Sequence, residues 1–242
     1  MGSNRVTASA EIVAEPCPGG GTRLPVLQSQ APLVLRRTAE GVYLVGAAAG
    51  PLGGDRLSLR ITVFPGASLC LRTVAASVAL PGLDDAESML TVTAAVAAGG
   101  VLEYLPEPFV VADGARHATD IRVTLAEGAS LTLRDELILG RHGEQGGSYR
   151  GRLRVDYADR PLLRQSLEVS GTDDVTRGPA ILSGHRACAT LLHVDPALDI
   201  PERTLADRFV ATMPLATGPA VLVTALANDA VTLRQRTAVP WR

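Results

Sequence analysis

Residues 57–73, LSLRITVFPGASLCLRT, contain the pattern that decides the fold class. Residues 57–63 alternate apolar and polar side chains, which is the period of a half-buried strand, and residues 68–73 resume the same alternation. The intervening residues 64–67, FPGA, contain the Pro and Gly that favour a turn. We therefore predict a β-hairpin in this stretch.

A second copy of this pattern lies in residues 121–134, IRVTLAEGASLTLR. The two copies align at a constant offset of 62 positions, which pairs Arg60 with Arg122 and Gly66 with Gly128. Self-similarity of this kind indicates an internal duplication. The sequence therefore predicts an internal hairpin repeat.

The rest of the chain consists mainly of short strand patterns separated by Gly and Pro. Many short, turn-bounded strands favour layered β-sheets over alternating strands and helices. We expect a mainly β, single-domain layered β-sheet scaffold over residues 21–242, preceded by an N-terminal segment, residues 1–20, that frays. The further predicted strands are residues 31–36, 42–46, 89–94, 101–105, 148–157, 162–170 and 220–227.

Two helices are expected in the C-terminal part. The sequence of residues 199–202, DIPE, is typical of a capped helix start with Pro in the first turn. Leu205, Phe209 and Val210 then give an apolar stripe that extends through Met213. A second helix is predicted over residues 228–239, after the last strand.

Composition excludes several classes of function. The chain has 242 residues, 46% of them hydrophobic, so it can bury a core, and its net charge of −2 and 3% aromatic content argue against nucleic-acid binding. All 23 cationic residues are Arg, which excludes a lysine Schiff base and a phosphate-loop lysine. The three cysteines, Cys17, Cys70 and Cys188, show no paired spacing, so neither a disulfide framework nor a Cys-only zinc site is expected. No apolar run is long enough to cross a bilayer, and we expect a cytoplasmic protein without membrane partners.

Two polar segments between predicted strands carry acidic candidates. In residues 49–56, AGPLGGDR, the simplest role of Asp55 is to bind local amides in a tight turn. In residues 102–108, LEYLPEP, the two prolines predict that the chain lies at a sheet edge or leaves the sheet. Glu103 and Glu107 could be a general acid and base, metal ligands or solvated charges.

A third polar segment, residues 134–144, RDELILGRHGE, places acidic residues and an imidazole around an apolar strand. Oxygen and imidazole ligands suit a borderline divalent cation such as nickel. The structural alternative is a strand that ends in a polar turn, with Asp135 and Arg141 in salt bridges.

At these three segments the sequence resembles the urease accessory protein D family, called H in some bacteria. The matching stretches are residues 50–55, GPLGGD, residues 102–106, LEYLP, and residues 139–141, LGR, followed by residues 143–144, GE, in the family's order and spacing. The family motif positions are Gly53, Gly54, Glu103, Tyr104, Pro106, Gly140 and Arg141.

The resemblance implies a non-enzymatic assembly factor that binds apo-urease and recruits the accessory proteins F and G, of which G is a nickel-carrying GTPase. It also implies that nickel passes through the interior of the scaffold towards the urease active site. The matching acidic positions are Asp55, Asp135 and Glu144. No tightly bound cofactor and no stable metal site are expected; nickel is transient, with His142 as a possible ligand.

Two alternatives come from other functional classes. The first is a metal-dependent hydrolase that uses Glu103, Glu107 and His142 around one cation. The second is a β-rich binding module for carbohydrate or protein that uses no metal.

Overall fold

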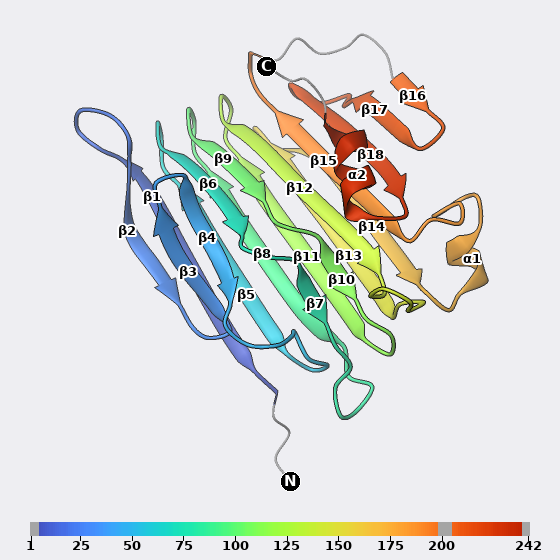
Figure 1. Cartoon of the computed structure of the whole chain (residues 1–242). Helices are drawn as coiled ribbons and strands as arrows, with labels where there is room; N and C mark the ends of the chain where they lie inside the picture. The colour runs from blue at the N-terminus through green and yellow to red at the C-terminus, as the bar shows by residue number, and fades with distance from the viewer. Residues whose placement is uncertain (1–4, 198–204, 239–242) are drawn as a thin grey trace.

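The computed structural model describes residues 5–197 and 205–238, which form two β-sheets packed face to face (Figure 1). Sheet A contains, in spatial order, β14 (Arg160–Ser170), β13 (Ser148–Tyr157), β11 (Arg116–Leu125), β8 (Ser88–Val96), β5 (Arg56–Val63), β1 (Thr7–Pro16) and β2 (Thr22–Ser29). Sheet B contains β16 (Leu205–Asp207), β17 (Val210–Pro214), β18 (Ala220–Ala227), β15 (Ala187–Val194), β12 (Ser130–Leu139), β9 (Val101–Leu105), β6 (Ser68–Thr73), β4 (Gly41–Gly46) and β3 (Leu33–Thr38). Two short strands, β7 (Ser77–Ala79) and β10 (Phe109–Val111), pair beside β12. The prediction of a mainly β, layered single domain is confirmed.

The core lies between the sheets and is built from aliphatic side chains. Alternate residues of each strand point inward, so that Ile12 and Ile61 of sheet A face Leu71, Leu102 and Leu131 of sheet B. All five are at most 1% exposed. Burying a side chain of this size stabilises the fold by about 1.5–3 kcal/mol, and the small share of aromatic residues is therefore no obstacle to a continuous core.

The predicted hairpin of residues 57–73 is wrong. β5 and β6 do not pair with each other: β5 pairs in parallel with β1 and β8 in sheet A, whereas β6 pairs in parallel with β4 and β9 in sheet B. The turn between them is an arch that crosses from one sheet to the other. The alternation of apolar and polar residues predicts which side chains face the core. A hairpin of β5 and β6 and an arch between two sheets bury the same side chains, so the sequence pattern could not identify the strand with which each pairs.

The internal repeat is present as stacked coils, each of which consists of a strand of sheet A, an arch and a strand of sheet B. The arches at residues 64–67, 97–100 and 126–129 each close with a backbone hydrogen bond of 2.8–3.1 Å between their first and last residues. Register places Arg60 beside Thr93 and Thr93 beside Arg122. The offset of 62 positions therefore spans two coils, and the middle coil, β8 and β9, is a third copy whose sequence has diverged.

The N-terminal segment contributes a strand to sheet A. β1 lies inside sheet A between β2 and β5, and Ile12 and Ala14 of this strand are completely buried. Part of residues 1–20 therefore forms a strand of sheet A, and the expectation that this segment frays stays a prediction; Met1–Asn4 lie outside the described residues.

The C-terminal prediction was right for one helix. Helix α2 (Ala230–Thr237) follows β18 as expected and is capped by Asp229, whose carboxylate accepts the backbone N–H of Thr232. The other predicted helix is wrong where it can be compared, because residues 205–214 form the β16–β17 hairpin, and the expected start at residues 199–202 lies outside the described residues. Pairing with β18 satisfies the backbone of β17, and this tertiary contact outweighs a weak helical pattern.

Helix α2 lies on the outer face of sheet B, in front of β15 and β18 (Figure 1). Leu233 of the helix is fully buried against a stripe of small residues, Ala187, Ala189, Ala225 and Ala227. The other helix, α1 (Asp174–Arg177), is a single short turn after β14 that the sequence did not predict. Neither helix is long and apolar enough to cross a membrane.

Candidate functional site

One carboxylate interrupts the apolar inner face of sheet B. Along β12, Leu131 and Leu133 point into the core, and Asp135 occupies the next inward position. Asp135 pairs in register with Thr190 of β15, whose side chain also points inward. The strand pattern therefore places a charged group where a core Leu would otherwise stand.

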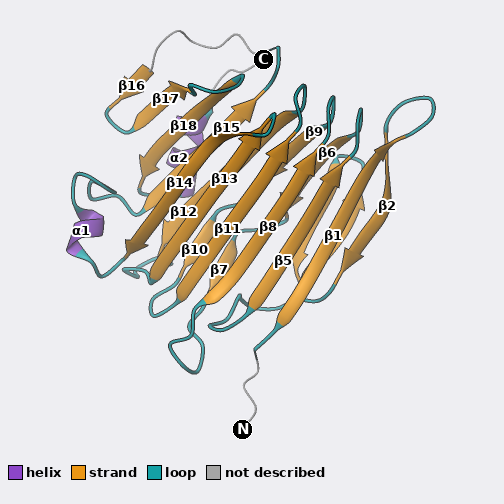
Figure 2. Ribbon diagram, turned by 180° about the vertical axis from the view of Figure 1, so that it is seen from behind, coloured by secondary structure: helices purple, strands orange, loops and turns teal. Residues whose placement is uncertain are grey.

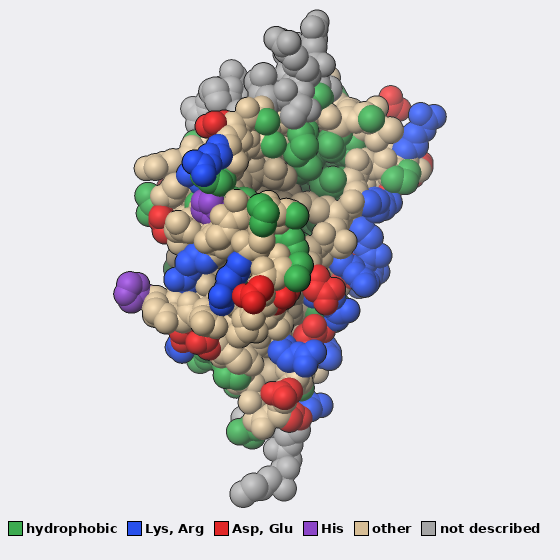
Figure 3. All heavy atoms as spheres, turned by 90° about the vertical axis from the view of Figure 1, so that its right-hand side faces the viewer, with side chains coloured by type: hydrophobic (Ala, Val, Ile, Leu, Met, Phe, Trp, Pro, Cys, Tyr) green, Lys and Arg blue, Asp and Glu red, His purple; other side chains and the backbone are tan. Residues whose placement is uncertain are grey.

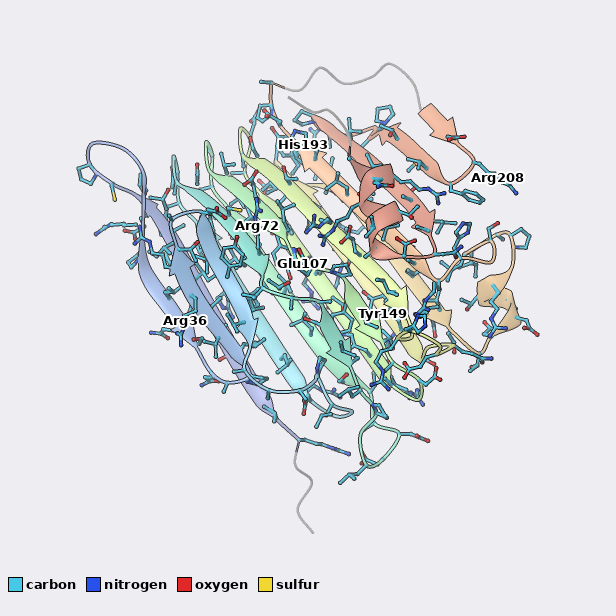
Figure 4. The ribbon with its side chains drawn as sticks, viewed as in Figure 1. Arg36, Arg72, Glu107, Tyr149, His193 and Arg208 are labelled. Atoms are coloured by element: carbon cyan, nitrogen blue, oxygen red, sulfur yellow. The ribbon has the colours of Figure 1, made fainter. Side chains whose placement is uncertain are left out.

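Asp135 lines a cavity of about 340 Å³ between the two sheets. Tyr149, Cys188 and Gln165 contribute further polar groups, and the side chains of Gln165 and Thr190 are joined across the sheets by a hydrogen bond of 3.1 Å. The cavity extends to the β16–β17 turn, where Arg208 is exposed, so it reaches the surface on that side (Figure 4).

Electrostatics in this cavity are dominated by Asp135. Burial, with a contribution from the neighbouring Glu136, raises the pKa of Asp135 to about 6. Burial and the charge of Asp135 in turn raise the pKa of Cys188 to about 12 and hold the pKa of Tyr149 well above its usual value. No side chain or backbone group in the described residues donates a hydrogen bond to the partly exposed Asp135 carboxylate, so no protein donor compensates its charge.

The Gly-rich loop holds Asp55 in a structural role. The Asp55 carboxylate is buried and accepts backbone N–H groups from Val6 at 2.8 Å and Leu52 at 2.9 Å. Gly54 has a φ of +91°, and a Cβ on Gly53 would lie 2.6 Å from a backbone nitrogen of a neighbouring loop. Asp55 therefore binds nearby backbone amides in a tight turn, which is the simplest role that the sequence suggested. These hydrogen bonds hold the start of β1 beside β5.

The Leu-Glu-Tyr-Leu-Pro motif divides between the two faces of sheet B. Tyr104 points inward and is buried, whereas Glu103 takes the alternate, outer position on β9. The chain leaves the sheet at Pro106, as the prolines predicted, and the guanidinium of Arg134 donates to the carbonyl oxygens of Leu105 and Pro106.

Glu107 belongs to a cluster of four charges on the outer face of sheet B, beneath α2. It binds Arg234 at 2.6 Å and lies 3.8 Å from Arg134. Glu136, whose side chain is fully buried, lies 3.4 Å from Arg234 and 3.7 Å from Arg134. These pairs attach the helix to the sheet, which gives Glu107 a structural role (Figure 4).

The third motif forms a tight loop after β12. Gly140 has a φ of +73°, and a Cβ there would lie 2.8 Å from the carbonyl oxygen of Glu144. The Glu144 carboxylate accepts the backbone N–H groups of Arg141 and Asp113 and pairs with the Arg141 guanidinium. Hydrogen bonds from Arg141 lower the pKa of Glu144 to about 2. His142 is exposed in the same loop.

The described residues do not contain the metal site that the hydrolase alternative requires. Within the described residues, no group of three or more His, Cys, Asp or Glu side chains is arranged to hold a metal ion. Glu107 is committed to arginines and His142 is exposed on its loop, so Glu103, Glu107 and His142 do not form a ligand set.

Sequence reasoning missed the partners of Asp135 in the cavity. Cys188 and Thr190 occupy inward positions of β15, and Tyr149 occupies one of β13. It also missed a buried stack in which His117 lies 4.2 Å from Phe109 between ring centroids, with burial lowering the pKa of His117 to about 3. The sequence did contain a signal for these residues, because they are polar residues at strand positions where the alternation predicts an apolar side chain. Only the strand pairing in the structure shows which of them lie in the same cavity.

Comparison with known proteins gives a consistent family. The sequence model of the UreD urease accessory protein family matches residues 6–242. The urease accessory protein UreD of Frankia alni is 45% identical, with 97% of this chain and 92% of the relative covered. The urease accessory protein UreD 3 of Streptomyces griseus is 47% identical, with 95% and 93% covered. A relative from Streptomyces avermitilis is 43% identical, with 95% and 94% covered. The chain therefore belongs to the UreD family of urease accessory proteins.

Proposed function

We propose that this chain is a non-catalytic scaffold of urease maturation in the cytoplasm. It binds apo-urease, brings the accessory proteins F and G to it, and lets nickel pass through its own interior towards the urease active site. Membership of the family supports the role in urease maturation. The observation that carries the proposed passage is the Asp135 carboxylate, which lines an interior cavity without a hydrogen-bond donor among the described residues.

The chemistry of this cavity suits a cation in transit. Asp135 is only partly exposed, and a carboxylate that water reaches poorly and that no protein group binds is costly; a divalent cation beside it would offset that cost. A closed set of four ligands would retain the metal, whereas conduction requires binding weak enough for the ion to leave. Asp135 with neutral neighbours, the Tyr149 hydroxyl and the Cys188 thiol, offers such a weak position for a borderline cation.

Asp55 and Glu144 are weaker candidates for the passage. Each carboxylate already accepts two backbone N–H groups, and Glu144 is also paired with Arg141. A cation would have to compete with these bonds. The proposal therefore rests on Asp135, and the other two positions remain predictions from the family pattern.

The proposal is tested in cells that express the urease operon with this gene intact, deleted, or carrying Asp135→Asn. Asn keeps the shape of the side chain and removes its charge. The expected result is that deletion leaves urease assembled but poor in nickel, and that Asp135→Asn is still recruited to apo-urease but restores little nickel. Urease activity and urease-bound nickel are both measured.

Asp174→Asn is the matched control, because the Asp174 side chain is fully exposed on α1. It should restore nickel like the intact gene. Full nickel loading with Asp135→Asn would remove the proposed passage, and full loading after deletion would remove the maturation role as a whole.

A further inference from the structure

The outer face of sheet A is bare in the described part of the chain. Figure 2 shows its strands without a covering helix, whereas α2 lies on the other sheet. The three neighbouring strands β11, β13 and β14 carry seven arginines and three carboxylates, a surplus of four positive charges. The whole chain has a net charge of −2, so positive charge is concentrated on these three strands. Two carboxylates border them: Glu87 pairs with Arg150 at 2.6 Å, and Glu11 of β1 lies opposite Arg60 of β5. In Figure 3, blue Arg side chains, with red carboxylates among them, follow the right-hand side of the molecule.

Strand register arranges the arginines in a row. Arg122 of β11 pairs with Arg154 of β13, which pairs with Arg164 of β14, and Arg60 of β5 lies in the same row on the other side of Thr93. Like charges directly opposite each other on neighbouring strands destabilise a sheet. The row of arginines is therefore expected to lower the stability of the fold, so stability alone does not explain it.

One carboxylate holds the centre of the row in place. Asp120 accepts hydrogen bonds from Arg122 at 2.7 Å and from Arg154 at 2.6 Å, and its side chain is only 8% exposed. Burial alone would raise the pKa of Asp120, but the hydrogen bonds from both arginines lower it, so the carboxylate stays charged. The two guanidinium groups are 55% and 37% exposed, and they share one negative charge. They are thus oriented in advance and keep free donors and a net positive charge towards solvent.

We infer that this arginine face, consisting of Arg60, Arg122, Arg152, Arg154 and Arg164, docks an acidic surface of a protein partner. Arginine is enriched at protein interfaces and binds carboxylates through two parallel N–H groups. Pre-orientation by Asp120 reduces the entropy lost on binding. The inference rests on the proposed function, in that the partner belongs to the urease maturation assembly.

A protein partner fits this face better than a nucleic acid or a membrane does. Asp120, Asp156 and Glu168 lie among the arginines and would repel a continuous phosphate backbone, and the chain as a whole is negative. No large apolar side chain in the strands of sheet A is exposed in the described residues, so the face has nothing to insert into a bilayer. Mixed charge with a moderate positive surplus matches a folded acidic surface.

The main test uses two double variants. Arg60→Glu with Arg152→Glu reverses two charges whose side chains make no ion pair among the described residues, so the fold should persist. Arg122→Gln with Arg154→Gln removes the central charges and keeps amide donors for Asp120. The control, Arg36→Glu with Arg37→Glu, makes the same charge change as the first variant on two exposed residues of β3 in sheet B. Thermal unfolding establishes that each variant is folded.

Each tagged variant is co-expressed with urease, F and G, and the retained partners are quantified. We expect the first variant to retain at least one partner about tenfold less than the wild type, with the control unchanged, because charge complementarity contributes energies of this size. If both double variants retain every partner at the wild-type level, the inference is overturned.

A second arm needs no urease component and uses poly-L-glutamate as the probe. The wild type should bind it more tightly than Arg60→Glu with Arg152→Glu, and added salt should weaken the binding. Equal binding by the two proteins, or tighter binding of the wild type to duplex DNA or anionic vesicles, overturns the inference. A wild type that retains no urease component but shows the poly-glutamate difference would remove the proposed function and leave the arginine face as a docking surface.

Discussion

Glu107, in the segment after β9, binds Arg234 of α2 at 2.6 Å, although the two residues are 127 positions apart in the sequence. The same guanidinium lies 3.4 Å from Glu136, whose side chain is fully buried. One arginine thus compensates two carboxylates and joins the C-terminal helix to the middle of sheet B.

Arg234→Met should loosen α2 and lower the free energy of unfolding by about 1–3 kcal/mol. Met keeps the apolar stem, but Glu136 then retains only Arg134, at 3.7 Å. Leaving a buried charge with a poorer partner has a cost of this order. Urea unfolding measures the change. Arg36→Met, on the exposed end of β3, should change stability by less than about 0.5 kcal/mol, and an equal loss in both variants would contradict the role of the cluster.

The arches between the sheets depend on glycine at one position. Gly66, Gly99 and Gly128 have φ values of +74°, +69° and +80°. A side chain in this left-handed region costs about 1–2 kcal/mol. Gly99→Ala should therefore destabilise the protein by that amount, even though its Cβ would meet no atom closer than 3.8 Å.

Gly46→Ala is the control for the arch prediction, because Gly46 lacks a positive φ and its Cβ would meet only one atom, at 3.9 Å. It should be neutral or slightly stabilising, since Ala restricts the unfolded chain. Comparable thermal midpoints for the two variants would show that the arches tolerate side chains.

These arches also show how far the sequence determined the fold. Alternation identified eleven of the eighteen strands in the described residues, because burial on one side of a strand imposes a period of two. It missed β1, β2, β7, β10, β15, β16 and β17. It could not distinguish β5 and β6 as a hairpin from β5 and β6 as opposite walls of a coil, because both place Leu59 and Leu71 in the core. The choice depends on β8 and β9, which lie between the two recognised copies and whose sequence does not repeat the pattern closely.

The candidate site was predictable in part for a similar reason. Asp135 could be identified as a candidate because its carboxylate, and its match to an acidic position of the family, can be recognised within the single segment of residues 134–144. Cys188 and Tyr149 could not be connected with it, because they come from β15 and β13, and antiparallel and parallel registers that only the fold defines bring them to one cavity. Asp55 and Glu144 were visible as acidic motif residues, but their backbone hydrogen bonds were not.

Glu144→Gln should release the loop after β12. The carboxylate accepts the backbone N–H of Arg141 at 2.8 Å and of Asp113 at 3.2 Å, and its lowered pKa of about 2 reflects these bonds. A lowered pKa means that the carboxylate stabilises the folded state above its ordinary pKa of 4.5, and that this contribution disappears as the pH falls towards 2. At neutral pH, the amides of Arg141 and Asp113 should exchange hydrogen faster in the variant.

Glu127→Gln, in the exposed arch between β11 and β12, provides the comparison for this loop. It should leave the exchange of both amides unchanged. Unaltered protection in Glu144→Gln would mean that the loop is held by Gly140 and its backbone contacts alone.

Asp135→Asn should make the protein more stable at neutral pH while it impairs nickel transfer. Burial disfavours the charged carboxylate in the folded state, which raises its pKa from 3.8 to about 6. The unfolded chain loses its proton at the lower value, so the destabilisation develops between about pH 4 and pH 6 and is complete above that range. At about 1.4 kcal/mol per pKa unit, Asn should gain up to about 3 kcal/mol at neutral pH and almost nothing near pH 4. Urea unfolding across this range tests the prediction, with the exposed Asp174→Asn expected to show no such trend. A gain that did not vary with pH would come from packing instead of charge, whereas a pH-dependent gain with lost nickel loading would identify Asp135 as a group kept for function at the expense of stability.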